Sequence, residues 1–415
     1  MRVQRVKTVF LTVVALVSLA FPAAAADTIK IAFIDPMSGP FASTGELMAN
    51  HFRGAIEQIN AKGGVLGGKK LELVVFDNRM SPQESLIILK KLTDQGIRLI
   101  TQGAGSNVAA ALSEGTAKIY ERTPEKAVLF LDYGATDPEL TNEKCNFWHF
   151  RFEADADMKL KVLTDYIAAQ KKIKKVYLIN QDYAHGQGVS RVARKMLAEK
   201  RPDIRVAGDD LHPVGKVKDF APYVAKIKSS GADAVISGNW GNDLALLVKA
   251  GKDAGLKVDW YTFYAGTTLT MNAAGEAGIG SLKQVTEYHR NVAGSNLEGY
   301  TRNFVKKYGR DFYYLRPNLV VEMLARAIDQ AKSTDPLKVA KALEGMKYQS
   351  DVGEMWMRPD DHQLMLPQFI SSMAKAGPGQ KVKYDLEGIG LGWKTDARYS
   401  MNDAVMPTGC KMTRP

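Results

Sequence analysis

The chain has 415 residues and a formal net charge of +11, and 45% of its residues are hydrophobic. This length exceeds what one hydrophobic core usually serves, so we expect two domains. The basic residues are spread along the chain, and no patch of them is interleaved with aromatic side chains, so we expect no binding to nucleic acid.

The first 26 residues have the pattern of a secretory signal peptide. Arg2, Arg5 and Lys7 precede an apolar run at 9–20, and the small residues 24–26 form a cleavage site. The apolar run is shorter than the roughly 20 residues that span a bilayer, so we expect cleavage and not a membrane anchor. Because no cysteine near the cleavage site could carry a lipid, we expect a freely soluble periplasmic protein with no direct membrane insertion.

Strands and helices alternate in the next part of the chain. This βαβ order builds a parallel sheet that is covered by helices on both faces. We expect strands at 29–33, 70–77, 98–101 and 127–131, and helices at 45–61, 81–95 and 107–120.

A second series of the same kind follows the segment 146–151. That segment is extended and aromatic, without the Gly, Pro or Ser of a flexible linker, and a stiff strand of this kind makes a defined hinge between two lobes. We expect strands at 175–180, 204–209, 234–237 and 259–263, and helices at 155–171, 188–200, 220–229 and 242–254.

The alternation ends after Thr267. Helical patterns occur at 295–308, 318–331 and 336–344, and mixed strands and loops follow from Gly353.

Three extended segments are expected to cross between the lobes, at 146–151, 284–291 and 351–357. Lobe one then comprises residues 27–147 and 291–350, and lobe two comprises residues 148–290 and 351–415.

The chain has only two cysteines, Cys145 and Cys410. An even number in an oxidising compartment predicts one disulfide, and two buried thiols are the alternative. Neither cysteine has the spacing of a metal ligand, and the six histidines stand far apart in the sequence, so we expect no metal site.

Motifs of common enzyme classes are absent from the sequence. It contains no Gly-x-Ser-x-Gly elbow, no His-Glu-x-x-His helix and no Walker loop. The turn at 103–106 follows a strand but lacks the third glycine of a dinucleotide-binding fingerprint. We therefore expect no catalytic residues and no cofactor.

Two turns of the first series have small residues just after a strand. One leads into Ser106, and the other contains Gly134, Ala135 and Thr136. A small-residue turn that opens a helix presents unpaired N–H groups and the positive end of the helix dipole, which suit a carboxylate. Because ligands of open α/β sheets bind at the carboxyl ends of strands, we expect the two turns to meet at one site. For Ser106 alone, an ordinary helix N-cap is the alternative.

Turns of the second series carry aromatic and imidazole side chains. Tyr183 and His185 follow one strand, and Trp240 and Tyr264 follow two others. Large aromatic side chains at such positions are typical of a binding surface, so we expect them to face the first lobe. Alternatively, Trp240 and Tyr264 merely cover strand ends.

Four stretches of the sequence resemble one known family. They are 30–40, 54–71, 135–140 and 182–188, and in this order and spacing they resemble the branched-chain amino acid binding proteins of ABC transporters. The resemblance implies an α/β, type I periplasmic binding fold, with two doubly wound parallel-sheet lobes joined by three crossovers. It also implies a monomer that is not an enzyme, captures a small-molecule solute and delivers it to an inner-membrane ABC permease.

The resemblance also implies roles for individual residues. Ser106 and the turn at 134–136 would hold the carboxylate of the ligand, and His185, with Tyr183 close by, and Trp240 would contact it from the second lobe. An acidic residue that holds the ligand's ammonium would lie at or beside Ala265, where this sequence has no carboxylate.

A buried ammonium without an acidic partner is strongly disfavoured, so we expect a carboxylate-type solute without an α-ammonium group. Leucine, isoleucine or valine binding, amide or urea binding, and a ligand-sensing receptor remain as alternatives.

Overall fold

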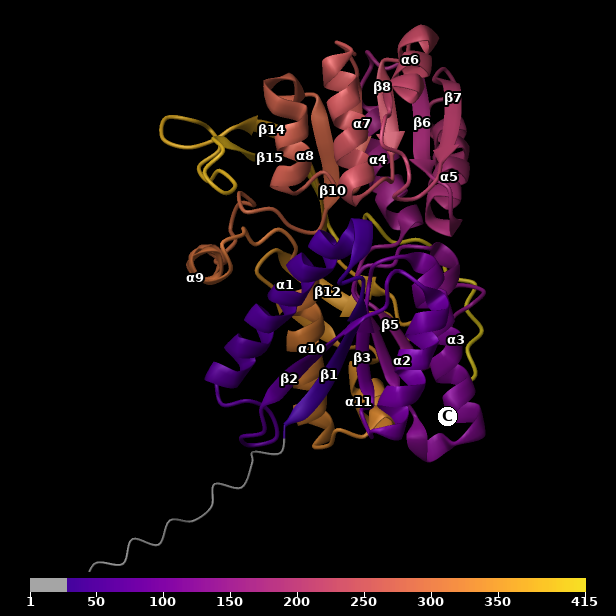
Figure 1. Cartoon of the computed structure of the whole chain (residues 1–415), viewed down its shortest axis with the longest axis vertical. Coiled ribbons are helices and arrows are strands. Elements are labelled where there is room, and N and C mark those ends of the chain that lie inside the picture. The colour runs from indigo at the N-terminus through magenta and orange to yellow at the C-terminus, as the bar shows by residue number, and fades with distance from the viewer. Residues whose placement is uncertain (1–27) are drawn as a thin grey trace, which may run out of the picture.

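The computed structural model describes residues 28–415, which form two lobes stacked along the long axis of the molecule (Figure 1). Each lobe is built around a β-sheet that helices cover. The signal peptide expected at 1–26 lies outside the described residues. Among these residues, no helix is both long enough and apolar enough to cross a bilayer.

Lobe one, the lower lobe in Figure 1, contains five parallel strands in the order β2-β1-β3-β4-β5. The central strands β3 and β4 are buried along their whole length, as expected for strands covered on both faces. The strands are β1 (Ile29–Asp35), β2 (Leu71–Asp77), β3 (Leu99–Gln102), β4 (Leu129–Asp132) and β5 (His149–Arg151). The helices are α1 (Ala42–Ala61), α2 (Pro82–Asp94), α3 (Ser106–Arg122), α10 (Arg316–Ala331) and α11 (Pro336–Leu343).

Alternate residues of β1 serve two different cores. Ile31 and Phe33 pack in the core that also contains side chains of α1 and α10, whereas Ala32 and Ile34 pack in a core with α2 and α3. Successive side chains of a strand point to opposite faces, so this run of apolar residues specifies a sheet with helices on both sides.

Lobe two contains seven strands in the order β15-β14-β10-β9-β8-β6-β7. Five of them, from β10 to β7, are parallel, while β14 and β15 are antiparallel additions at one edge. The strands are β6 (Lys175–Gln181), β7 (Arg205–His212), β8 (Ala234–Ser237), β9 (Asp259–Thr262), β10 (Leu282–Thr286), β14 (Gln368–Lys375) and β15 (Leu391–Tyr399). The helices are α4 (Ala156–Ala168), α5 (Ala184–Lys200), α6 (Ala221–Ser230), α7 (Gly241–Asp253) and α8 (Thr268–Ala274).

The chain passes between the two sheets at three places. The first passage follows β5 and leads to α4, and the second follows β10 and leads through α9 (Glu298–Tyr308) to α10. The third differs from the expected position at 351–357, because those residues form β12 (Gly353–Met357) of a small antiparallel sheet with β11 (Lys347–Ser350) and β13 (Leu364–Met365). The chain enters the sheet of lobe two only at β14.

The C-terminal tail also differs from the expected division of the chain, which assigned 351–415 to lobe two. After β15 the tail returns to lobe one, where the C-terminus lies near α3 (Figure 1). Cys410 forms a disulfide with Cys145, with 5.8 Å between their Cα atoms. The neighbouring Gly409 N–H donates to Oδ1 of Asn142 over 2.9 Å. The tail that follows β15, the edge strand of lobe two, is therefore linked covalently to lobe one. This link adds to the three passages of the chain between the lobes.

We predict that replacing both Cys145 and Cys410 by serine lowers the free energy of unfolding by about 2–5 kcal/mol, because the disulfide closes a long loop and restricts the unfolded chain. Urea unfolding of the oxidised protein and the double variant measures the difference. The reduced protein is the control, and it should unfold at the same urea concentration as the double variant. Equal midpoints for the oxidised protein and the variant would contradict a stabilising role.

Candidate functional site

A cavity lies between the lobes, where the strands of both sheets end and the turns that follow them face each other. Its lining includes all eight residues expected from the sequence to form a site, together with others that the sequence did not single out. No aspartate or glutamate of the described chain lines it, whereas two arginines do. The lining residues from the sequence prediction are Ser106, Gly134, Ala135, Thr136, Tyr183, His185, Trp240 and Tyr264. The lining also includes Leu47, Met48, Tyr133, Arg310, Tyr314 and Arg316.

The buried side chain of Asp35 fixes the backbone of the turn before α3. The N–H groups of Gly103 and Ala104 donate to Oδ1 of Asp35 over 3.4 and 3.0 Å, and the Tyr133 hydroxyl donates to the other oxygen. Gly105 has φ = 90°, a conformation that favours glycine. These contacts leave the start of α3 at the cavity wall, where helix geometry gives the N–H of Ser106 no partner within the helix.

The second small-residue turn is organised in the same way by Asp132. The N–H groups of Gly134 and Ala135 donate to its Oδ1 over 2.9 and 2.8 Å. The prediction that these two N–H groups are donors for a ligand is therefore corrected, because Asp132 already occupies them. Thr136 is the member of this turn whose hydroxyl reaches across the cavity.

His185 links the lobes across the cavity. Its Nε2 lies 3.0 Å from the Gly238 carbonyl oxygen, and its Nδ1 lies 2.8 Å from the hydroxyl of Thr136. Burial lowers the pKa of His185 to about 4, so the ring is neutral at neutral pH. Because a carbonyl only accepts, the proton is on Nε2 and the Thr136 hydroxyl donates to Nδ1. The Thr136 oxygen can then only accept a further hydrogen bond.

The wall of lobe two is aromatic. The indole N–H of Trp240 donates to the Tyr183 hydroxyl over 2.9 Å, which leaves the proton of that hydroxyl available to another acceptor. The ring of Phe41, from lobe one, lies 4.3 Å from that of Trp240. The side-chain amide of Asn242 donates to the Pro40 carbonyl over 3.3 Å. The two lobes thus contact each other at the rim of the cavity.

Four buried charges form a cluster beside the cavity. Arg316, at the start of α10, lies 2.6 Å from Glu153 and 3.4 Å from Glu287, and Lys159 of α4 lies 3.0 Å from Glu153. Glu153 follows β5 and Glu287 follows β10, so each carboxylate sits on one of the passages between the sheets. The Arg316 charge keeps the pKa of Glu287 below its usual range although burial acts to raise it.

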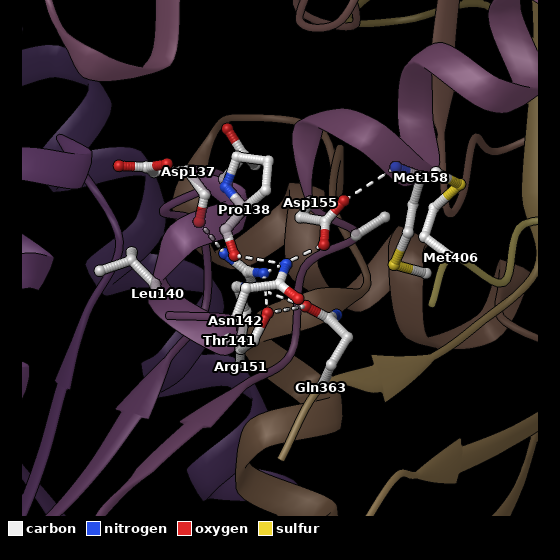
Figure 2. Close-up of polar contacts among 12 residues, drawn as sticks. Asp137, Pro138, Leu140, Thr141, Asn142, Arg151, Asp155, Met158, Gln363 and Met406 are labelled. Carbon is white, nitrogen blue, oxygen red and sulfur yellow. Dashed lines mark hydrogen bonds and ion pairs between the residues drawn. The ribbon is translucent and has the colours of Figure 1, made fainter. Parts of the chain in front are cut away.

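Arg151, the last residue of β5, connects this strand to Gln363, the residue before β13 (Figure 2). Its guanidinium donates to Oε1 of Gln363 and to the Asp137 carbonyl over 2.5 Å each, and it lies 3.2 Å from a carboxylate oxygen of Asp155. Gln363 in turn donates to the Glu153 carbonyl over 2.8 Å. These contacts hold the residue just before β13 against the end of β5.

Comparisons with known proteins agree with this architecture. Residues 28–378 match a model of the periplasmic binding protein family, and the Leu/Ile/Val-binding protein homolog 4 of Brucella abortus is 31% identical over 94% of both chains. The chain belongs to the leucine-type periplasmic binding proteins of ABC transporters. Members of this family are solute-binding proteins and not enzymes.

Other periplasmic binding proteins extend the similarity. The leucine-, isoleucine-, valine-, threonine-, and alanine-binding protein of Pseudomonas aeruginosa is 26% identical, over 85% of this chain and 91% of its own. The crystal structure of the corresponding Brucella ovis protein in its closed conformation has a TM-score of 0.84 and 29% identity, and the alignment covers 94% of this chain and all of that one. A Rhodopseudomonas palustris protein in complex with 3,4-dihydroxy benzoic acid shares the fold, with a TM-score of 0.76 and 19% identity, and covers 90% of this chain and 98% of its own.

Several lining residues escaped the sequence analysis. Arg310, Tyr314 and Arg316 lie near the start of α10, after the alternation of strands and helices has ended, and no turn motif marks them. One feature of the sequence did point to Asp35, which supports the turn before α3. It is the last residue of β1 and is followed by a long turn of small residues.

We predict that Arg151→Lys lowers the free energy of unfolding by roughly 3 kcal/mol. A lysine keeps the charge but cannot reproduce the fork of donors that reaches Gln363, Asp137 and Asp155 together, so buried acceptors lose their partners. Chemical denaturation measures the change, with Arg326→Lys on an exposed face of α10 as the control. Equal losses in the two variants would contradict the role of Arg151.

The pH dependence of stability tests the environment of Asp35. Burial raises the pKa of Asp35 to about 7, from 3.8. Between these values the native protein keeps a proton that the unfolded chain releases. The contribution of Asp35 to stability is therefore fully present below about pH 4 and falls by roughly 4 kcal/mol as the pH rises through 7.

Asp35→Asn removes this titration. We predict that the variant becomes more stable relative to the parent as the pH rises from about 4 to about 8, because only the parent loses the contribution of Asp35 to the unfolding free energy. Denaturation at a series of pH values measures the shift, and Asp182→Asn, at an exposed position, is the control. A difference that stays constant with pH would show that Asp35 is ionised in the folded protein throughout.

Proposed function

We propose that this protein is the periplasmic component of an ABC importer that captures a small carboxylate without an α-ammonium group and delivers it to the inner-membrane permease. The observation that carries the proposal is the composition of the cavity lining, which holds Arg310 and Arg316 and no acidic side chain of the described chain. Side-chain donors and the start of a helix favour an anionic group that accepts hydrogen bonds, whereas an ammonium group would lack an acidic partner.

The buried acids near the cavity do not supply that partner. Glu153 and Glu287 are paired with Arg316, and Asp35 and Asp132 accept N–H groups of the two turns. Binding an ammonium group would require one of these carboxylates to leave a buried partner, which is costly. The α-amino acid class is therefore less favoured for this chain than for the relatives whose names state that they bind leucine, isoleucine and valine.

Roles for the lining residues follow from their contacts. Ser106 and the first turn of α3 would hold the carboxylate, and the oxygen of Thr136 would accept from a ligand hydroxyl. Tyr183, Trp240 and Tyr264 would cover a flat apolar body, while Gly134 and Ala135 shape the opposite wall.

Aromatic carboxylates fit this arrangement, because the wall of lobe two is aromatic and presents the Tyr183 hydroxyl. Solved proteins of the same fold are in complex with 3,4-dihydroxy benzoic acid, 4-hydroxybenzoate and benzoate. Branched-chain amino acids are the second candidate, because the relative at 31% identity is named a Leu/Ile/Val-binding protein homolog. We further propose that residues 1–26 direct export to the periplasm and that the protein acts as a monomer.

Thermal-shift and calorimetric titrations with benzoate, its hydroxy derivatives, levulinate and leucine test the proposal. We expect the carboxylates without an ammonium group to stabilise the protein, by about 2.7 kcal/mol at a hundredfold excess over the dissociation constant, and leucine to have no effect. Ser106→Ala should weaken binding about tenfold by removing a hydrogen bond to a charged group.

The control for Ser106 is Ser113→Ala, which removes a buried hydroxyl from the same helix outside the cavity. A clear shift with leucine alone, abolished by Ser106→Ala, would overturn the proposed ligand class in favour of the α-amino acids.

A further inference from the structure

Arg316 uses only one of its three side-chain nitrogens for the ion cluster. Nη1 lies 2.6 Å from Glu153 and 3.4 Å from Glu287, whereas among the described residues the buried Nε has no hydrogen-bond partner and none accepts from Nη2. The side chain is 96% buried, with 4% of its surface exposed, and it lines the cavity. A buried guanidinium with an unpaired Nε and Nη2 edge lacks an acceptor, and leaving such donors unpaired is costly.

The surroundings of the guanidinium leave this edge as its free side. The Tyr314 ring lies 4.2 Å from the guanidinium carbon and the Tyr264 ring 5.7 Å from it, and both tyrosines also line the cavity. Rings stacked near a guanidinium cover its faces and leave its edge to form hydrogen bonds. The glutamates occupy the Nη1 end, so Nε and Nη2 are the donors that remain for a ligand in the cavity that Arg316 lines with the two tyrosines.

The formal charges of the cluster balance, because Arg316 and Lys159 face Glu153 and Glu287, although burial raises the pKa of Glu153. A second carboxylate placed here would be a buried charge without a free counter-charge, whereas a neutral oxygen would satisfy the donors at lower cost. The rings of Tyr264 and His185 lie 6.4 Å apart, and Arg316 lies beside Tyr264 whereas the hydroxyl of Thr136 contacts His185. The position at Arg316, at the start of α10, is thus distinct from the carboxylate position proposed at Ser106, at the start of α3.

We infer that Arg316 is a specificity-determining residue that donates hydrogen bonds from its Nε and Nη2 edge to a neutral oxygen of the ligand, at a point away from the ligand carboxylate. The inference rests on the proposed function and narrows it. The ligand class is a carboxylate with a second, uncharged oxygen, a hydroxyl or a carbonyl, in preference to a purely apolar carboxylate or a dicarboxylate.

Matched probes test this inference on the full mature protein. Calorimetric titration compares para-hydroxybenzoate with para-methylbenzoate, which is similar in size but lacks the oxygen, and with terephthalate, which adds a second carboxylate. Levulinate and pentanoate form a corresponding aliphatic pair. We expect the probe with the neutral oxygen to bind about tenfold more tightly than its partner in at least one pair, and terephthalate to bind more weakly than para-hydroxybenzoate.

Arg316→Lys then separates the two roles of this side chain. A lysine keeps a cation beside Glu153 and Glu287 but lacks the free edge, so the preference for the oxygen-bearing probe should fall to about twofold or less while the carboxylate itself still binds. Arg290→Lys is the matched control, because Arg290 is also an arginine paired with two carboxylates, Glu298 and Asp311, but does not line the cavity. This control should retain the full preference.

The outcomes distinguish the inference from the proposed function. Equal affinity within both probe pairs in the parent protein overturns the inference and leaves the proposed function in place, and this comparison needs no variant to fold. A preference that survives in Arg316→Lys also overturns it. If none of the carboxylates binds and leucine does, the proposed function and the inference both fail.

Discussion

The relative placement of the lobes depends on the pairing of the buried charges Glu153, Lys159, Glu287 and Arg316. Each comes from a different segment: the passage after β5, the start of α4, the passage after β10 and the start of α10. Burying any of them alone would be strongly unfavourable, so the folded state requires all four segments to meet. The cluster therefore fixes where two of the passages between the sheets run and sets one end of the cavity beside them.

The same pairing explains the chemical character of the cavity. Glu153 and Glu287 are paired with Arg316, so they are not available to a ligand cation. Arg316 itself has N–H donors without a partner among the described residues. The two small-residue turns follow a related principle. Asp35 and Asp132 accept hydrogen bonds from their N–H groups and fix their backbone, so that Ser106 and Thr136 are held in place.

Contacts between the lobes lie on both sides of the cavity. His185 and Thr136 meet inside it, and Phe41 and Trp240 meet at its rim. On the side of the passages, Arg151 of β5 contacts Gln363 before β13 and Asp155 at the start of α4, and the tail adds a disulfide to lobe one. The lobes are thus joined by a hydrogen bond and a ring contact at the cavity. On the side of the passages, buried polar contacts and a disulfide join them. Such a distribution suits closure of the two lobes over a ligand.

The sequence by itself determined the alternation of strands and helices through β9, since apolar periodicity and turn residues are local properties. The sequence also predicted that the eight turn residues lie at the carboxyl ends of the strands, because the strands of a parallel sheet end on the same side. Only the tertiary structure decided that β12 belongs to a separate small sheet, that the tail returns to lobe one, and that Asp132 takes the N–H groups of Gly134 and Ala135. The same holds for Arg316, which reaches the cavity because α10 folds back onto lobe one. These features rest on contacts between residues far apart in the chain, and no local pattern encodes which distant partner a buried polar group will meet.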